Sequence, residues 1–255
     1  MNPLTHITSL TRQQRQEIHA LVSLCKEAEP LSLSAPYEDG LDYFLLYQEN
    51  SGLLLGFAFL FFPQEDTCEC SVFIHPDYRK KGLCSSILNQ VLDYVEKYEK
   101  KRNCQLDFCF LTDPATPSAK AVLESLEAEY WYSEYKMVRT LKEKDRLYVP
   151  SLDIRETEPG IYTASLDGLI IGSCAVLSSE TLLPSGKEFY LYAFQIKESH
   201  QGQGYGKDFL LGMLALLAPM GSQVSVQVSG QNYIARNLYK KTGFQTADTL
   251  SYYLY

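Results

Sequence analysis

The sequence predicts an α/β (α+β) fold made of two similar domains in tandem, each with a mixed, mostly antiparallel sheet flanked by helices. The chain has 255 residues, which suits one large domain or two small ones. Strand-like and helix-like apolar patterns follow the order β–β–β–α–β–α–β, and this order repeats from about residue 150. We therefore expect domains of residues 1–148 and 149–255, with the boundary near Val149 and Pro150.

The first domain begins with a helix. Its apolar residues have the i, i+3, i+4, i+7 spacing of one helix face: Ile18, Leu21, Val22 and Cys25. Strands are expected at 43–47, 53–62, 69–74, 106–111 and 130–141. A helix with an apolar face from Ile87 to Val95 precedes the fourth strand. A shorter helix starts at Thr116 and Pro117, a favourable N-cap and first-turn pair.

The second domain repeats this order without room for the leading helix. One helix is expected at 205–218, and another from Asn232 to Gly243, where the glycine ends it. The turn Asp167-Gly168 predicts a hairpin. The expected strands are 161–164, 169–176, 189–196, 224–228 and 250–255.

Charge and composition exclude several kinds of partner. Lys and Arg total 23 against 31 Asp and Glu, and the formal net charge of −8 lacks the basic excess that binding to a phosphate backbone needs. We therefore expect no nucleic-acid partner, and the acidic balance favours a cationic substrate. The longest apolar runs, 53–62 and 209–218, are far shorter than the ~20 residues that span a bilayer, so we expect no membrane partner.

The cysteines and histidines indicate neither a disulfide framework nor a metal site. Seven cysteines, an odd number, occur without CxxC spacing, and the four histidines are scattered. The amino-terminal residues lack the apolar stretch of a signal peptide. We expect reduced thiols, no metal ligands and a cytoplasmic location.

A glycine-rich loop lies between an expected strand and an apolar helix: Gln201-Gly202-Gln203-Gly204-Tyr205-Gly206. Glycines let backbone N–H groups face an anion, and the helix start adds unpaired N–H groups, so a diphosphate suits this site. The Walker A and dinucleotide motifs need other spacings, and a simple turn is the alternative. The first copy has a basic loop at the same place, which suits phosphate or is merely solvated: Arg79-Lys80-Lys81-Gly82-Leu83-Cys84.

A second pattern lies on the helix after the next strand. Asn232, Ala235 and Tyr239 have the i, i+3, i+7 spacing of one helix face. The small side chain of Ala235 leaves room for a ligand on this helix face. Asn232 can hydrogen-bond an amide-rich ligand, and Tyr239 can present a hydroxyl. The alternative for Tyr239 is a core aromatic whose hydroxyl lies near water.

Together these segments resemble the GNAT superfamily of acyl-CoA-dependent N-acetyltransferases. The shared pattern is a strand, [RQ]-x-x-G-x-[GA], a helix, a strand and N-x-x-A-x-x-x-Y-x-x-x-G-F. The resemblance is strong for about residues 161–255 and partial for about 1–148. It implies acetyl-CoA as cosubstrate, a cofactor contact at Asn232, and a pyrophosphate loop formed by Gln201, Gly202, Gln203, Gly204, Tyr205 and Gly206.

The resemblance also implies direct transfer of an acetyl group to a primary amine in a ternary complex. Tyr239 is the expected general acid. The expected base is Glu188, which alternates with Tyr190 and Tyr192 along a strand, and a solvent-exposed strand start is the alternative for it. Backbone groups at the end of this strand are expected to bind CoA and polarise the thioester: Phe194, Gln195 and Ile196.

The first copy departs from the pattern. Cys84 stands where Gly or Ala is usual. When residues 117–130 are matched to the second copy, Ala121 alone agrees, and the other positions differ: Ser118 for Asn, Ser125 for Tyr and Glu129 for Gly. A serine hydroxyl is much less acidic than a phenol, so we expect a catalytically weak or inactive first copy.

Another class of function stays open. A non-catalytic acyl-CoA-binding or scaffolding protein is the main rival, although an intact Tyr239 argues against it. The acceptor is a small-molecule amine or a peptide amine, and the sequence does not choose between them. Monomer and homodimer are both compatible with the sequence.

Overall fold

The structure is a computed structural model that describes residues 3–38, 40–180 and 187–255. It forms two compact units. The first unit comprises the chain up to Ser133 together with Leu250–Tyr255, and the second comprises Glu134–Thr249. The predicted division between residues 148 and 149 follows the repeat in the sequence. The two compact units of the structure are instead defined by the contacts between residues.

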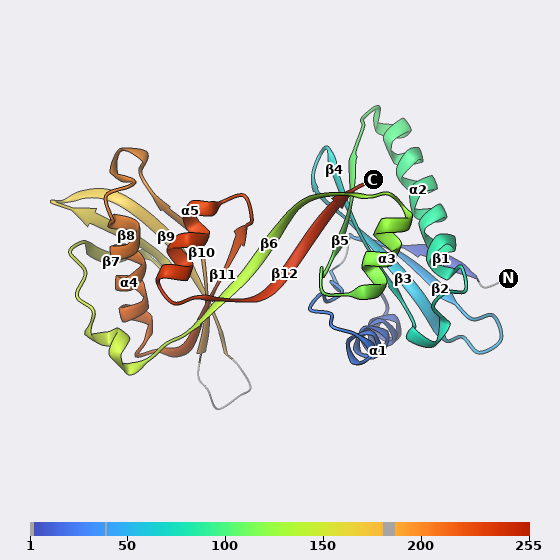
Figure 1. Ribbon diagram of the computed structural model, residues 1–255, viewed down its shortest axis with the longest axis horizontal. Coiled ribbons are helices and arrows are strands. Elements are labelled where there is room, and N and C mark those ends of the chain that lie inside the picture. The colour runs from blue at the N-terminus through green and yellow to red at the C-terminus, as the bar shows by residue number, and fades with distance from the viewer. Residues whose placement is uncertain (1–2, 39, 181–186) are drawn as a thin grey trace. The chain divides into compact units, whose positions relative to one another are not determined.

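The first unit has a mixed sheet and three helices among its described residues: α1 (Arg12–Ala28), α2 (Leu83–Arg102) and α3 (Pro117–Ser125) (Figure 1). Neighbouring strands are antiparallel except β4 and β5, which are parallel. The strand order is β1 (Leu4–Ile7), β2 (Asp42–Tyr47), β3 (Leu54–Gln64), β4 (Thr67–Ile74), β5 (Asp107–Thr112) and the end of β12 (Gln245–Leu254).

Helices cover both faces of this sheet. Successive residues of a strand point to opposite faces. Tyr43 and Leu45 of β2 therefore pack in the core that α1 closes, while Phe44 and Leu46 pack in the core that α2 closes. The predicted apolar face of α1 is confirmed, since its buried residues are Ile18, Leu21, Val22 and Cys25.

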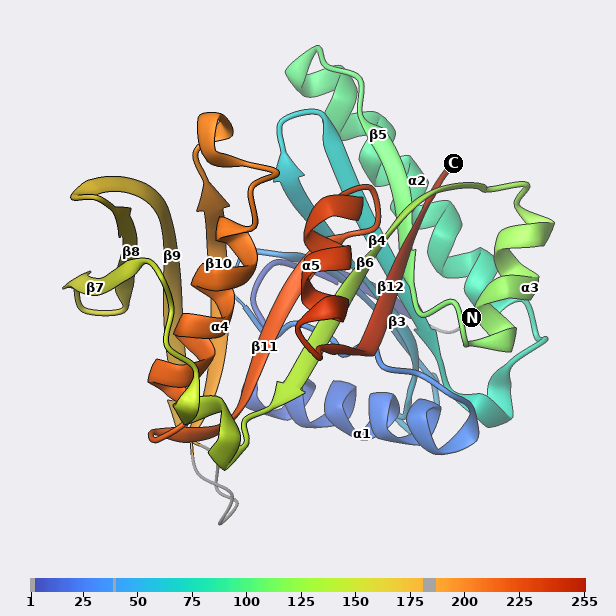
Figure 2. The same ribbon diagram turned by 60° about the vertical axis from the view of Figure 1, so that its left-hand side comes forward.

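The second unit also has a mixed sheet, in which only β10 and β11 are parallel among the pairs of its described strands. Helix α4 (Tyr205–Leu217) packs against β10 and helix α5 (Tyr233–Lys241) against β11 (Figure 2). The strand order is β6 (Glu129–Thr140), β11 (Gly221–Ser229), β10 (Lys187–Ile196), β9 (Leu169–Glu180), β8 (Ile161–Leu166) and β7 (Asp153–Glu158).

One face of the second sheet carries exposed aromatic side chains. Phe189 and Leu191 of β10 are buried in the core beneath α4 and α5, whereas Tyr190 and Tyr192, which alternate with them, are 36% and 38% exposed. Among the described residues of this unit no helix corresponds to α1, as the sequence predicts. The rings of Tyr190 and Tyr192 are therefore partly exposed on this face.

The last strand of each copy pairs with the sheet of the other copy. Residues 134–140 of β6 pair with β11, and residues 251–254 of β12 pair with β5. Each sheet is therefore completed by a strand that the other half of the sequence supplies. This exchange is why the compact units differ from a simple cut of the chain.

Most predicted elements are confirmed to within a few residues. Asp167 and Gly168 have φ angles of 50° and 81°, as a two-residue hairpin requires. Two strands were not predicted. Strand β1 has only four residues and β7 is largely polar and exposed, so neither carries a clear apolar periodicity.

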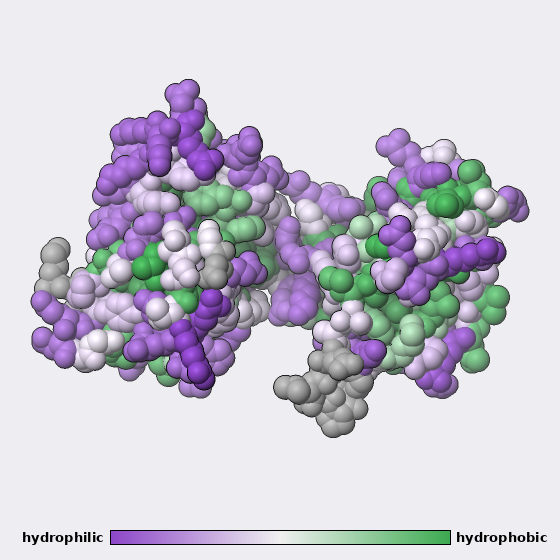
Figure 3. Space-filling view, turned by 180° about the vertical axis from the view of Figure 1, so that it is seen from behind, coloured by the Kyte–Doolittle hydropathy of each residue, from purple (hydrophilic) through white to green (hydrophobic). Residues whose placement is uncertain are grey.

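The surface is mixed. On the face drawn in Figure 3 both units carry hydrophilic and neutral areas, with hydrophobic areas among them on each unit. Within the described residues, every helix is too short or too polar to cross a bilayer. The seven cysteines are free thiols, and five of them are buried.

Candidate functional site

Each unit contains a place where two parallel strands separate. In the second unit β10 and β11 pair as far as Tyr190 and Ser225, although the strands continue to Ile196 and Ser229. In the first unit β4 and β5 pair as far as Cys70 and Phe110 and then continue. Such a gap in a sheet can receive an extended ligand, because the backbone groups that line it no longer bond to each other.

A β-bulge in β10 lies beside this gap in the second unit. The register with β9 shifts between Tyr192 and Gln195, and Ala193 has a φ of 48°. A bulge leaves an extra residue outside the ladder and re-aims its neighbours. Of the three residues predicted to bind CoA here, Phe194 stacks on Phe209 with ring centroids 5.0 Å apart. The Phe194 ring therefore packs against the core of this unit, while Gln195 and Ile196 pair with Ser173 and Gly172 of β9.

The predicted pyrophosphate loop follows directly. Gly202 and Gly204 have φ angles of 73° and 93°, and a Cβ at either would meet open space. The Nε2 of Gln201 donates to the carbonyl of Ile196 at 2.8 Å, and that of Gln203 to the carbonyl of Ser199 at 3.1 Å. The two glutamine side chains hold the loop in shape, which leaves its backbone to face a ligand.

The loop ends at the start of α4. Gly204 is the N-cap residue and forms no side-chain cap, so the first-turn N–H groups point toward solvent without a side-chain acceptor. A Cβ on Gly206 would lie 3.7 Å from Leu238, an ordinary contact. Tyr205 begins the helix, with its ring 6.3 Å from that of His200. This geometry fits the diphosphate of a CoA ester.

The first unit repeats the loop geometry with a different sequence. Arg79 Nε donates to the carbonyl of Ile74 at 3.2 Å, as Gln201 does to Ile196. Lys80 has a φ of 58° and Gly82 one of 76°, which match Gly202 and Gly204. The two loops thus share their backbone conformation, although the first loop has a glycine at only one of the two positions, Gly82.

Tyr239 lies at the inner side of the site in the second unit. It is 6% exposed on α5, and its ring centroid is 5.5 Å from that of Phe244. Burial, then the nearby Cys174 and Tyr190, raises the pKa of Tyr239 to about 12. Among the described residues no acceptor binds its hydroxyl. The hydroxyl is also not among the fully buried polar side-chain atoms that lack a partner, of which the described residues contain one, Nη1 of Arg139. The hydroxyl of Tyr239 is therefore not fully sealed from solvent. Its raised pKa keeps it protonated at neutral pH.

Asn232 caps α5. Its Oδ1 accepts a hydrogen bond from the backbone N–H of Ala235 at 3.0 Å. The side-chain oxygen thus already accepts one hydrogen bond, and the amide NH2 group is the donor that could make the ligand contact that the sequence predicts.

The predicted base lies on the exposed aromatic face. Glu188, Tyr190 and Tyr192 alternate with the buried Phe189 and Leu191 and share one side of β10. The rings of Tyr190 and Tyr192 are stacked, 5.7 Å apart at 8°. Burial, then the charge of Glu134 and the neighbouring Tyr192, raises the pKa of Tyr190. The face combines aromatic rings with the carboxylates of Glu188 and Glu134. Tyr190 also lies near enough to Tyr239 to contribute to its raised pKa.

The structure corrects the predicted match between α3 and α5. Both helices have nine residues, with Thr116 and Asn232 as N-cap residues. The C-terminal turns also agree, because Glu127 has a φ of 55° and Gly243 one of 90°. Positions 116 residues apart therefore correspond, so the assignments of Ser118, Ala121, Ser125 and Glu129 were wrong by two residues. Thr116, Ala119, Leu123 and Glu127 take those places.

The first unit consequently has a leucine where the second has its phenol. Leu123 is 6% exposed, like Tyr239. Strand β4 also keeps a regular register with β3 to its end, where Ile74 pairs with Gly56, whereas β10 is bulged. The first unit thus differs from the second at two features that acyl transfer would use.

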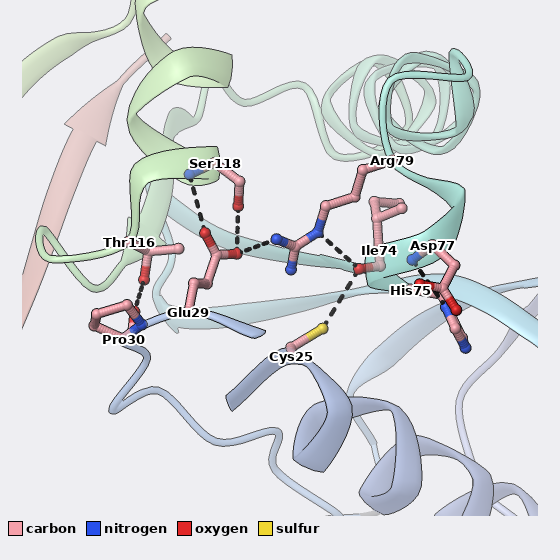
Figure 4. Close-up of polar contacts among 9 residues, drawn as sticks. All are labelled: Cys25, Glu29, Pro30, Ile74, His75, Asp77, Arg79, Thr116 and Ser118. Carbon is pink, nitrogen blue, oxygen red and sulfur yellow. Dashed lines mark hydrogen bonds and ion pairs between the residues drawn. The ribbon is translucent and has the colours of Figure 1, made fainter. Parts of the chain in front are cut away.

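The first unit nevertheless holds a cavity of about 360 Å³ at its strand separation, lined by β4, β5, α2 and α3. A cluster of polar side chains forms part of its wall (Figure 4). Glu29 pairs with Arg79 and accepts hydrogen bonds from Ser118, and Cys25 contacts the carbonyl of Ile74 at 3.4 Å. Sequence reasoning missed Glu29 and Cys25, which follow no motif. In the part of the chain that the structure describes, no group of His, Cys, Asp and Glu side chains is placed to hold a metal ion.

Two family models match the chain, one on each copy. The acetyltransferase (GNAT) family matches residues 12–118, and the FR47-like protein family matches residues 178–253. The first copy therefore matches the GNAT family model, and the chain has the fold of GNAT proteins. It is similar in fold to a GCN5-related N-acetyltransferase from Sphaerobacter thermophilus, with a TM-score of 0.75 and 14% identity over 100% of this chain and 96% of that one.

A second solved structure also has the tandem arrangement. A tandem GNAT protein from the clavulanic acid biosynthesis pathway has a TM-score of 0.67 and 14% identity, over 99% of this chain and 98% of that one. The uncharacterized N-acetyltransferase YycN of Bacillus subtilis (strain 168) is 35% identical over 65 residues, which are 25% of this chain and 42% of that protein. The recognised resemblance and the tandem fold are confirmed.

Proposed function

We propose that the second unit transfers an acetyl group from acetyl-CoA to a primary amine, directly, in a ternary complex. The observation that carries this proposal is the position of Tyr239. A buried, protonated phenol lies at the separation of β10 and β11, in a unit that also has a β-bulge and an uncapped helix start. These are the donors that acyl transfer from a thioester needs.

The loop before α4 suits the carrier. CoA supplies the reactive thioester and an anionic diphosphate. The open positions beside Gly202 and Gly204 let the diphosphate approach the backbone, and the free N–H groups at the start of α4 bind its oxygens. The amide NH2 of Asn232 is then available to the amides of the pantetheine arm.

The bulge and Tyr239 serve the chemical step. Backbone N–H groups of residues 194–196 stabilise the oxyanion that forms as the amine attacks the thioester carbonyl. The C–S bond then breaks, and Tyr239 donates its proton to the departing thiolate. Because its pKa is raised to about 12, the phenol is protonated throughout the neutral range.

The exposed face of β10 binds the acceptor. A protonated amine is attracted by the faces of Tyr190 and Tyr192 and by the charges of Glu188 and Glu134. Glu188 removes the proton that the amine must lose before it attacks, directly or through water. The acceptor is a cationic amine, free or on a peptide.

Replacement of Tyr239 tests this function. In Tyr239→Phe we expect kcat to fall about 100-fold to 10,000-fold, the usual contribution of a positioned acid, with an unchanged Kd for acetyl-CoA. The matched control is Tyr233→Phe, which removes a hydroxyl from the same helix at a side chain that is 68% exposed. Equal kcat values for Tyr239→Phe and the unmodified protein would refute the role of Tyr239. Tight binding of acetyl-CoA without turnover of a panel of amines would favour a non-catalytic acyl-CoA-binding protein.

A further inference from the structure

The cavity of the first unit has no role in the reaction described above. We propose that it is a separate binding site for a small, uncharged aromatic molecule of about two fused rings. Three features point to this ligand: a wall of rings, leucines and thiols, polar groups that already bind one another, and the volume that remains.

The wall of the cavity is apolar and polarisable. Two aromatic rings line it, that of Phe73 from β4 and that of Phe110 from β5. Three thiols also belong to the lining: Cys25, Cys70 and Cys84. Burial raises the pKa of each thiol, so all three are uncharged at neutral pH. Sulfur atoms and ring carbons make favourable contacts with another aromatic ring, and they gain by its removal from water.

The segment that follows α1 forms one side of the cavity. Two leucines of this segment line it: Leu31 and Leu33. Ser32 lies between them and instead donates its backbone N–H and its hydroxyl to Asp113, at 2.6 and 2.7 Å. The hydroxyl of Thr116 donates to the carbonyl of Pro30 at 2.7 Å (Figure 4). The polar groups of the segment are therefore bound to the end of β5 and the start of α3, and its apolar side chains face the cavity.

The charged groups in the wall compensate each other. The Glu29 side chain is 10% exposed and that of Arg79 is 24% exposed, and they form an ion pair. The carboxylate also accepts from the hydroxyl of Ser118 at 2.6 Å and from its backbone N–H at 3.2 Å (Figure 4). Arg79 donates its Nε–H to the carbonyl of Ile74 at 3.2 Å. The other charged residue of the lining, Lys80, is exposed to solvent. An ionised ligand would therefore find no unpaired counter-charge in the interior, and its burial would be unfavourable.

The volume of the cavity sets the size of the ligand. An engineered apolar cavity of ~150 Å³ holds one benzene molecule. The cavity of the first unit has about 360 Å³ and lies in the volume range of small-molecule sites. It is more than twice as large as the benzene site, so it has room for two fused rings.

The wall carries no group that would transform such a ligand. Leu123 lines the cavity at the position that Tyr239 has in the second unit. The leucine replaces a hydroxyl by apolar surface, and the thiols of the wall are not ionised. The first unit therefore binds the molecule and releases it unchanged.

The test is calorimetric titration of the full chain with indole and, separately, with indoxyl sulfate, which has the same rings and a negative charge. Ala119 lines the cavity and corresponds to Ala235 in the second unit, so Ala119→Trp and Ala235→Trp are matched variants. We expect an indole site that Ala119→Trp removes and Ala235→Trp leaves intact. Indoxyl sulfate should bind this site at least about 100-fold more weakly, because its charge finds no partner in the interior.

Three results would overturn the proposal. The first is the absence of an indole site that depends on Ala119. The second is equal affinity for indole and indoxyl sulfate, which would contradict the uncharged interior. The third is displacement of indole from this site by CoA, which would assign the cavity to a phosphorylated cofactor. The acetyl-transfer rate of the unmodified chain is measured in parallel, so a failure of the transferase proposal would be seen separately.

A measurement on the unmodified chain decides the matter if tryptophan prevents folding. Cys84 lines the cavity and Cys104 does not, while both thiols are partly exposed. Indole at about ten times its Kd should slow the alkylation of Cys84 by iodoacetamide about tenfold, because only the unoccupied fraction reacts. The alkylation of Cys104 should keep its rate, and mass spectrometry of peptides measures both thiols. If indole leaves the rate at Cys84 unchanged, the cavity is not its binding site and the proposal is wrong.

Discussion

Removal of the charge of Glu29 tests the ion pair in the first unit. In Glu29→Gln the amide still offers an acceptor to Ser118 but leaves the guanidinium of Arg79 without a counter-charge. Breaking a fully buried pair costs about 3–5 kcal/mol and an exposed pair contributes about 0.2–1 kcal/mol. Because the two side chains are 10% and 24% exposed, we expect a loss of about 2 kcal/mol in the free energy of unfolding.

The assay is a double-mutant cycle measured by urea unfolding of the full chain. Glu29→Gln, Arg79→Gln and the double variant should give a coupling of about 1–2 kcal/mol, since the double variant leaves no unpaired charge. The control is the pair Glu96 and Lys100 on α2, whose side chains are 61% and 72% exposed. If Glu29 and Arg79 show no more coupling than this exposed pair, the cluster does not act as a compensated unit and the argument for a neutral cavity wall is wrong.

Three further predictions follow from the second unit. Gly204→Ala should lose about 1–3 kcal/mol of stability, because the φ of 93° at this position strains an L-residue. Gly206→Ala within α4 should gain up to about 1 kcal/mol, because alanine favours a helix over glycine. Thermal melts compare the two variants. The transfer rate should not fall between about pH 8 and pH 10.5 through Tyr239, because a phenol with its pKa raised to about 12 stays protonated there, and a loss centred near pH 10, the ordinary tyrosine value, would contradict this. Asp208→Asn should lose about 2–3 kcal/mol in urea unfolding, since its carboxylate accepts four hydrogen bonds from residues 148–152.

The sequence predicts the elements that have a strong local signal. The spacing of apolar residues in α1 and the alternation of Val224, Val226 and Val228 in β11 correspond to burial in the structure. Turn chemistry is equally local, as Asp167-Gly168 shows. The glycine-rich loop was recognised for the same reason, since its backbone conformation depends on the residues within it.

The register of α3 shows where local pattern fails. The sequence identified Thr116 as the N-cap residue, yet matching by motif placed Ser125 opposite Tyr239. Helix ends decide the register instead. Backbone hydrogen bonds run from Ala128 to Leu123 at 3.1 Å and from Phe244 to Tyr239 at 3.0 Å, so both helices end in the same turn. The left-handed residue of this turn is Glu127 in one copy and glycine in the other, which hides the match in the sequence.

Contacts between distant residues were beyond sequence reasoning. Glu29 and Ser118 lie 89 positions apart, and no sequence pattern links them. The bulge at Ala193 depends on how β10 pairs with β9, and no turn residue marks it. Both features lie beside the strand separations, because the ion pair of Glu29 lines the cavity of the first unit and the bulge shifts the register of β10.

The exchange of end strands makes the two copies depend on each other for a complete sheet. Residues 251–254 pair with β5, the ring of Tyr252 stacks on that of Tyr132 at 4.4 Å, and Ser251 shares a hydrogen bond with Ser133 at 2.8 Å. All these contacts lie in the first unit, although the last strand directly follows helix α5 of the second copy. Loss of the first unit would therefore leave the last strand of the second copy without its partner. Each half of the sequence therefore depends on a strand of the other half to complete its sheet, whether or not both copies carry a phenol at the position of Tyr239.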